Sequence, residues 1–211
     1  MKRFITSLLL GLALGAVVAV AEAPGPETLV RETSDRMLTV LKQQHETISA
    51  EPQKLYELVD DIVLPHFDFE RMSRWVLGKH WKRATPEQQQ RFVNEFRTLL
   101  VRTYGTALLD YTDLKINYLP LRMAEGSEDV TVRTEVMQPG RQPIPINYSM
   151  FRRADGWKVY DVAIDGISLV SNYRTDFSNQ INTAGLDALI QKLVERNAQG
   201  SGVDTGAKGG T

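Results

Sequence analysis

The chain of 211 residues contains no cysteine, which excludes disulfides, thiol catalysis and a cysteine-linked lipid anchor. Its three histidines, His45, His66 and His80, fall in different predicted elements and lack metal-ligand spacing. No P-loop, dinucleotide-binding fingerprint or G-x-S-x-G motif occurs. The formal net charge of −1 argues against nucleic-acid binding. The sequence therefore indicates neither a metal site nor a nucleotide-dependent or serine-nucleophile enzyme.

Long apolar runs are missing everywhere except at the N-terminus. Lys2 and Arg3 precede an apolar run from Phe4 to Val20, and Ala19 and Ala21 form a small-residue cleavage site. This order predicts a secretory signal peptide over residues 1–21, cleaved after Ala21. A retained membrane anchor is the alternative, but the run is shorter than the about 20 apolar residues that usually span a bilayer.

The rest of the chain is expected to form one domain and a tail. Residues 22–196 have the usual size of a single domain and contain no internal repeat. Residues 197–211, NAQGSGVDTGAKGGT, are rich in glycine and are expected to be disordered. Charge is uneven, with ten acidic and four basic residues in 27–70 but two acidic and eight basic residues in 71–103. This pattern is typical of solvated helix faces or of a docking surface with two signs of charge.

Apolar spacings of three and four residues predict helices in the first half of the chain. One helix includes residues 29–41, and a second begins at Pro52 and stops at Pro65. Asp68 can cap a short third helix that Gly78 ends.

A long fourth helix has the clearest start signal. Thr85 is a suitable N-cap, Pro86 occupies the first helical position, and Gln88 stands three residues after the cap. The apolar stripe that follows continues as far as Tyr111. We therefore expect a helix long enough to cross a small domain.

The period changes to two between residues 114 and 164, which predicts four strands. The short connections AEGSED, QPGRQP and ADG are turn-forming, so the strands should form hairpins. Helical spacing returns after Gly166 and again after Gly185. The predicted fold class is α+β, a four-stranded antiparallel meander with helices packed on its apolar face.

The segment WKVYDVAIDGISLV (157–170) can be interpreted in two ways. Asp161, Asp165 and Ser168 could be catalytic groups, or the segment could be one wall of an apolar pocket with a polar rim. Outward-facing carboxylates lack the burial and the partner that acid or base chemistry needs. We therefore assign no catalytic residue, and we expect Ser168 to act as an N-cap acceptor.

Strand alternation places Tyr160, Val162 and Ile164 on the apolar side of this segment and Asp161 on the other. Gly166 then allows a sharp turn, after which Ile167 should continue the wall from the next helix.

Two motifs together resemble a known family. RATPEQQQRFVNEFRTLLVRTYGTALLDY (83–111) is followed by GWKVYDVAIDGISLVSNYRTDF (156–177), behind a signal peptide. The chain from Glu27 to Arg196 is similar to the MlaC family of periplasmic phospholipid-binding proteins, also called the toluene tolerance family. The tail has no counterpart in this resemblance.

The resemblance implies a monomeric periplasmic carrier without catalytic residues, cofactor or metal. Its ligand would be phospholipid, with the acyl chains held between sheet and helices. Its partners would be the MCE-domain component of an inner-membrane ABC transporter and an outer-membrane lipoprotein–porin complex, with no nucleic acid.

The candidate site residues divide into an acyl-chain wall and a basic docking cluster. The basic cluster is Lys79, Lys82, Arg83 and Arg91. The expected lipid-binding residues are Leu100, Tyr104, Leu108, Tyr111, Ile116, Val132, Val136, Ile146, Tyr148, Met150, Tyr160, Val162, Ile164, Ile167 and Val170.

Two other functions remain open from the residues alone. A hydrolase or isomerase could use Asp161 together with Tyr160 or Tyr148 of the pocket. An envelope adaptor could bind protein only. In that case the apolar wall would be ordinary core.

Overall fold

The computed structural model describes residues 24–105, 115–124, 126–137 and 140–199. Seven α-helices and two 3₁₀ turns are found in these ranges. The elements before the sheet are α1 (Pro26–Gln43), α2 (His45–Ala50), α3 (Pro52–Ile62), η1 (Leu64–His66), α4 (Phe69–Leu77), η2 (Gly78–Arg83) and α5 (Pro86–Gly105). Those after it are α6 (Leu169–Ala184) and α7 (Leu186–Ala198). None of the described helices is long and apolar enough to cross a membrane.

The sheet is antiparallel, with its strands in chain order β1-β2-β3-β4-β5. Its strands are β1 (Lys115–Tyr118), β2 (Asp129–Met137), β3 (Ile144–Arg153), β4 (Gly156–Ile164) and β5 (Ile167–Ser168). The predicted α+β fold and its meander are confirmed. The fifth strand was not predicted, because Asp165 and Gly166, both at positive φ, turn the chain back along β4 before α6 begins.

The predicted helix starts are confirmed by their hydrogen bonds. The Thr85 hydroxyl accepts from the Gln88 backbone N–H at 3.2 Å, and the Gln88 side chain accepts from the Thr85 N–H at 3.0 Å. Asp68 caps α4 by accepting from the Arg71 N–H at 2.8 Å, and Gly78, at φ 52°, ends that helix. These caps depend on neighbours in sequence, which is why the sequence predicts them.

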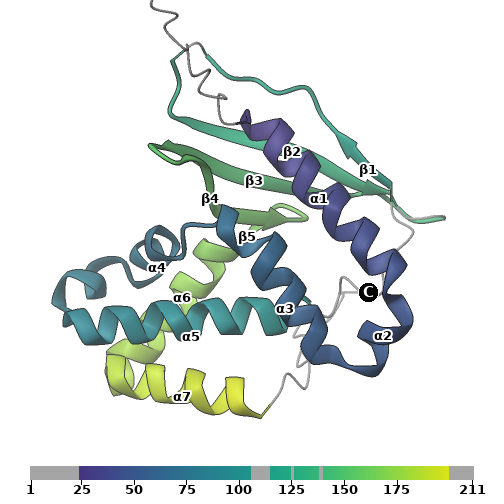
Figure 1. Ribbon diagram of the computed structural model, residues 1–211. Coiled ribbons are helices and arrows are strands. Elements are labelled where there is room, and N and C mark those ends of the chain that lie inside the picture. The colour runs from purple at the N-terminus through teal and green to yellow at the C-terminus, as the bar shows by residue number, and fades with distance from the viewer. Residues whose placement is uncertain (1–23, 106–114, 125, 138–139, 200–211) are drawn as a thin grey trace, which may run out of the picture.

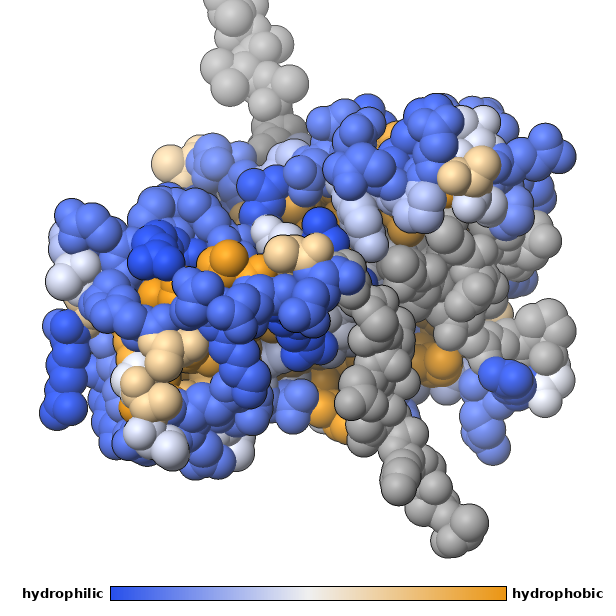
Figure 2. Space-filling view, turned by 90° about the horizontal axis from the view of Figure 1, so that it is seen from below, coloured by the Kyte–Doolittle hydropathy of each residue, from blue (hydrophilic) through white to orange (hydrophobic). Residues whose placement is uncertain are grey.

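The helices cover one face of the sheet (Figure 1). Helix α1 crosses β2 and β1, while α4, α6, α5 and α7 lie beyond the other strands. The main core joins the sheet to α4 through α7 and to Leu29 and Val30 of α1. A second, smaller core holds α1, α2 and α3 together around Leu41, Ile48 and Leu55. Seen from below, the helical side is mostly hydrophilic, with hydrophobic residues showing in small areas (Figure 2).

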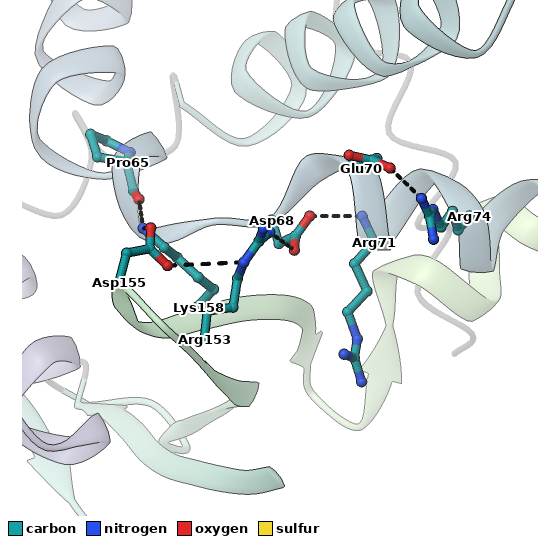
Figure 3. A network of polar contacts seen from close by, with 8 residues as sticks. All are labelled: Pro65, Asp68, Glu70, Arg71, Arg74, Arg153, Asp155 and Lys158. Carbon is teal, nitrogen blue, oxygen red and sulfur yellow. Dashed lines mark hydrogen bonds and ion pairs between the residues drawn. The ribbon is translucent and has the colours of Figure 1, made fainter. Parts of the chain in front are cut away.

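A polar network joins the start of α4 to the β3–β4 hairpin (Figure 3). The Asp68 carboxylate, 7% exposed, accepts from Arg153 at 2.7 Å in addition to capping α4. Lys158 donates to the Pro65 carbonyl at 2.9 Å and pairs with Asp155 at 3.1 Å. The backbone N–H of Asp68 also donates to the Val159 carbonyl. This end of the helical layer is therefore tied to the sheet by side chains and by backbone.

A β-bulge interrupts the alternation of β4. Ser149 pairs with Asp161 and Met150 pairs with Val159, so Tyr160 has no partner on β3. The expectation that Tyr160 alternates with Val162 on the apolar face is therefore wrong. The Tyr160 ring instead contacts the rings of Phe151 and Trp75.

The fold extends slightly further at its C-terminus than the sequence suggests. Helix α7 includes Asn197, which is buried and donates to the side chain and the backbone carbonyl of Glu95. The start of the expected tail is thus part of the domain, and residues 200–211 lie outside the described residues.

Candidate functional site

The apolar face of the sheet has a closely packed end and a more open end. Val130, Val132, Met150 and Val159 are buried against the helices. Toward the other end of the strands, Ile144, Ile146, Tyr148 and Ile164 are only half-buried, although they lie on the same face. We name these four residues the open wall. Part of the apolar surface of these four residues is left uncovered, so an apolar ligand in contact with them would remove that surface from water.

Most of the expected lipid-binding residues meet on this face or on the helices beside it. Five are buried in the main core, and Tyr104, Ile146, Tyr148 and Ile164 pack against it half-buried. Tyr160 also packs against this core, but from the bulge of β4 and outside the alternation of the apolar face. The five buried residues are Leu100, Val132, Met150, Val162 and Val170.

Two of the remaining expected residues lie on the same face, toward β1. Ile116 pairs with Val136, and Val136 pairs with Ile144 of the open wall. Ile167 is 61% exposed, so the expectation that it continues the wall from a helix is wrong. It lies in β5, which follows the turn at Asp165 and Gly166 directly. Leu108 and Tyr111 lie outside the described residues.

Hydroxyl groups interrupt the apolar surface at the β1–β3 side. Thr134 is 1% exposed and donates to the Ile146 carbonyl at 3.0 Å. Burial raises the pKa of Tyr148 to about 12, with a further contribution from nearby Tyr118 and a smaller opposing one from Thr134. Burial also raises the pKa of Tyr118. Both phenols are therefore neutral donors at physiological pH.

A second tyrosine pair lies at the C-terminal end of α5. Burial, together with a hydrogen bond to Tyr173, raises the pKa of Tyr104. Tyr173 belongs to an aromatic cluster with Phe96 and Phe177. The sequence pattern contains Tyr118 and Tyr173 at apolar positions, but the residues around their hydroxyls come from distant segments, so no local signal identifies them.

The corner between β4 and α6 contains the two groups that could suggest an enzyme. Ser168 is the N-cap of α6, as predicted, and its hydroxyl accepts from the Ser171 N–H at 3.0 Å. Asp161 accepts from the Ser168 hydroxyl at 2.5 Å and from the Val170 N–H at 3.1 Å. Each carboxylate oxygen of Asp161 accepts a hydrogen bond in this corner, so Asp161 orders the turn between strand and helix. These bonds join a strand to a helix.

The predicted basic cluster is exposed and projects from one end of the helical layer. Lys79, Lys82 and Arg83 belong to η2, and Arg91 lies in the second turn of α5. Within the described residues these four have no ion pair. Trp75 of α4, a few residues before this cluster, is 48% exposed.

The described residues contain no group of three or more histidines, cysteines or acidic residues that could hold a metal ion.

Comparison with known proteins agrees with this arrangement. The family model of the MlaC protein matches residues 31–195. The chain belongs to the MlaC family. Among curated relatives, the toluene tolerance protein ttg2D of Pseudomonas putida is 30% identical over 181 residues, covering 85% of this chain and 83% of that protein.

A second MlaC relative has a more descriptive name. The intermembrane phospholipid transport system binding protein MlaC of Haemophilus influenzae is 26% identical over 184 residues, covering 86% of each chain. Among solved structures, a phospholipid-binding protein of Ralstonia solanacearum in complex with a phospholipid is 36% identical, with a TM-score of 0.78. That match covers 83% of this chain and 98% of the other. The MlaC fold and a lipid ligand thus occur together in a structure similar to this one.

Proposed function

We propose that this protein is a periplasmic phospholipid carrier. It binds acyl chains against the apolar face of its sheet and moves lipid between the outer membrane and an inner-membrane MCE-type ABC transporter. The half-buried open wall supports this proposal most directly, since a solved relative of the same fold holds a phospholipid. Residues 1–21 would be the signal peptide, and residues 22–196 the lipid-binding domain, which acts as a monomer.

The energetics of lipid transfer require an enclosed apolar site. Two acyl chains of about sixteen carbons lose roughly 25 kcal/mol when they move from lipid to water, at about 0.8 kcal/mol per CH₂. Unassisted crossing of the periplasm would be negligible at this cost. A carrier must keep the chains dry while the headgroup stays in water. The open wall provides apolar side chains at the edge of a packed core, which suits this task.

The basic cluster is the surface that we assign to partner docking. Its four cations lack ion pairs within the described residues, so they keep their full charge for a partner. Residues 27–70, by contrast, carry the excess of acidic charge. A cationic end would attract an acidic face of the transporter's MCE-domain component and speed the encounter. The outer-membrane lipoprotein–porin complex would be the second partner.

The docking proposal is tested by charge reversal. The triple variant Lys82→Glu, Arg83→Glu and Arg91→Glu should associate more slowly with the MCE-domain component and show a weaker salt dependence, with unchanged lipid content. The matched control reverses three exposed cations outside the cluster: Lys115, Arg122 and Arg141. Unchanged association of the first variant at low salt, or an equal loss in the control, would count against this surface.

The carrier proposal is tested by mass spectrometry of lipid extracted from the purified protein. Intact phospholipid supports a carrier. Lysolipid or free fatty acid would favour a hydrolase acting through Asp161, and an empty protein would favour an adaptor. The hydrogen bonds of Asp161 to Ser168 and Val170 already give that carboxylate a structural role, which favours the carrier.

A further inference from the structure

Three hydroxyl groups stand together on a sheet face that is otherwise apolar. Tyr118 of β1 pairs with Thr134 of β2, and Thr134 pairs with Ile146 of β3. Tyr148 lies two residues along β3 from Ile146, on the same side. Tyr118 and Thr134 therefore adjoin the open wall, to which Tyr148 belongs, at its β1 side.

One of these three hydroxyls lacks a hydrogen-bond acceptor. Thr134 uses its only proton on the Ile146 carbonyl. The Tyr118 hydroxyl is buried and has no hydrogen-bond partner among the described residues. The Ser34 hydroxyl of α1 lies close enough to lower the pKa of Tyr118, but the two groups do not meet the usual distance and angle limits of a hydrogen bond. A buried donor without an acceptor costs about 1–3 kcal/mol, so this hydroxyl gains free energy from any acceptor that a water molecule or a ligand brings to it.

The surroundings of Tyr118 resemble the boundary between lipid and water. Its ring is covered by the Arg31 guanidinium of α1, 3.9 Å from the ring centroid. The Arg31 side chain is about half-exposed and pairs with Glu27, so a charged group in contact with solvent covers this tyrosine ring. On its inner side follow Tyr148 and the aliphatic part of the open wall. The order is thus cation, hydroxyl, then aliphatic surface, which is also the order of phosphate, glycerol ester and acyl chain in a phospholipid.

We propose that the Tyr118 hydroxyl donates a hydrogen bond to an acceptor oxygen at the polar end of the bound lipid, and so sets how deeply the acyl chains enter. This inference rests on the proposed function. The acceptor is an ester carbonyl or a phosphate oxygen, both of which accept a neutral O–H donor. An aliphatic ether oxygen in place of the ester lacks the carbonyl acceptor, and diacylglycerol lacks the phosphate.

The test lets two lipids compete for binding to the full-length mature protein and measures the ratio of the bound amounts. The protein is equilibrated with vesicles that contain equal amounts of ester-linked and ether-linked phosphatidylcholine of the same chain length. In a second arm the vesicles contain ester-linked phosphatidylcholine and the matching diacylglycerol. Bound lipid is extracted and quantified by mass spectrometry. Tyr118→Phe is compared with wild type, and Tyr56→Phe, in the groove between α3 and α5, is the matched control.

The expected result is that wild type favours one lipid of a pair by about two- to tenfold, the ratio that one hydrogen bond supports. Tyr118→Phe should bring that ratio close to one, while Tyr56→Phe keeps it. A lost ester preference identifies the carbonyl as acceptor, and a reduced phospholipid preference identifies the phosphate. Unchanged ratios in Tyr118→Phe, with lipid still bound, would overturn this inference and leave the carrier proposal standing. A wild type that takes up no lipid would overturn both.

Discussion

The polar groups in the corner between β4 and α6 should affect the stability of the fold and not the turnover of any substrate. Their hydrogen bonds allow the size of the stability effect to be predicted. Ser168 and Asp161 accept from the N–H groups of Ser171 and Val170, two of the four that a helix start leaves free. Removing an N-cap hydroxyl costs about 1 kcal/mol. For a domain of this size, each kcal/mol lowers the melting temperature by about 2–4 °C. Ser168→Ala should therefore melt about 2–4 °C below wild type.

Asp161→Asn should have a comparable effect for a different reason. The amide oxygen can still accept one hydrogen bond, but the negative charge at the start of α6 is lost, which costs about 0.3–1 kcal/mol. The two substitutions should not be additive, because Ser168 donates directly to Asp161. Circular dichroism melts of the two single variants and the double variant measure this coupling, and lipid extraction checks that bound phospholipid is unchanged. If either single variant abolished a hydrolytic activity present in the wild type, the structural reading of this corner would be refuted.

Two further predictions concern the junction shown in Figure 3 and the turn beside it. Arg153→Ala should destabilise the fold by about 1–2 kcal/mol in chemical denaturation, because it removes a partner from the buried Asp68 carboxylate. Burial, and then the charges of Lys158 and Arg36, lower the pKa of His66, so the unfolded chain binds its proton more readily. Stability is therefore lost as the pH falls below about 6.5, and His66→Gln should show a smaller drop in melting temperature between about pH 7 and about pH 5.

A specific result would contradict each of these two predictions. Asp155→Ala removes an exposed carboxylate that pairs with Lys158 at 3.1 Å and with Arg153 at 3.9 Å, and it should change stability little. An equal loss of unfolding free energy in Asp155→Ala and Arg153→Ala would mean that the pair of Arg153 with the buried Asp68 contributes no more than an exposed ion pair. For His66, identical acid-induced shifts in wild type and His66→Gln would show that other groups dominate the acid response.

The features that the sequence predicts well are those that neighbouring residues determine. The caps at Asp68 and Thr85 depend on residues three positions away, and the turn at Gly166 depends on a glycine that tolerates positive φ. The alternation of the strands identifies the apolar face and its buried residues Val130, Val132, Met150 and Val162, while the helical spacings supply most of the main core.

The features that the sequence misses depend on partners far along the chain. The bulge at Tyr160 exists only because β3 opposes it with Ser149 and Met150, and this register cannot be read from β4 alone. Alternation therefore assigns Tyr160 to the wrong side. The sequence likewise does not predict that the Tyr118 hydroxyl is buried without a partner among the described residues, because its surroundings include residues of α1, far away in the chain.

Lipid occupancy of the open wall tests the central claim most directly. Native mass spectrometry should find wild-type protein carrying phospholipid mass. Ile146→Glu should be folded but empty, because an unpaired carboxylate among acyl chains costs several kcal/mol. Asn147→Glu, one residue along β3 on the opposite face, should keep its lipid and serves as the matched control. A folded Ile146→Glu protein that retains a full complement of lipid would contradict the account.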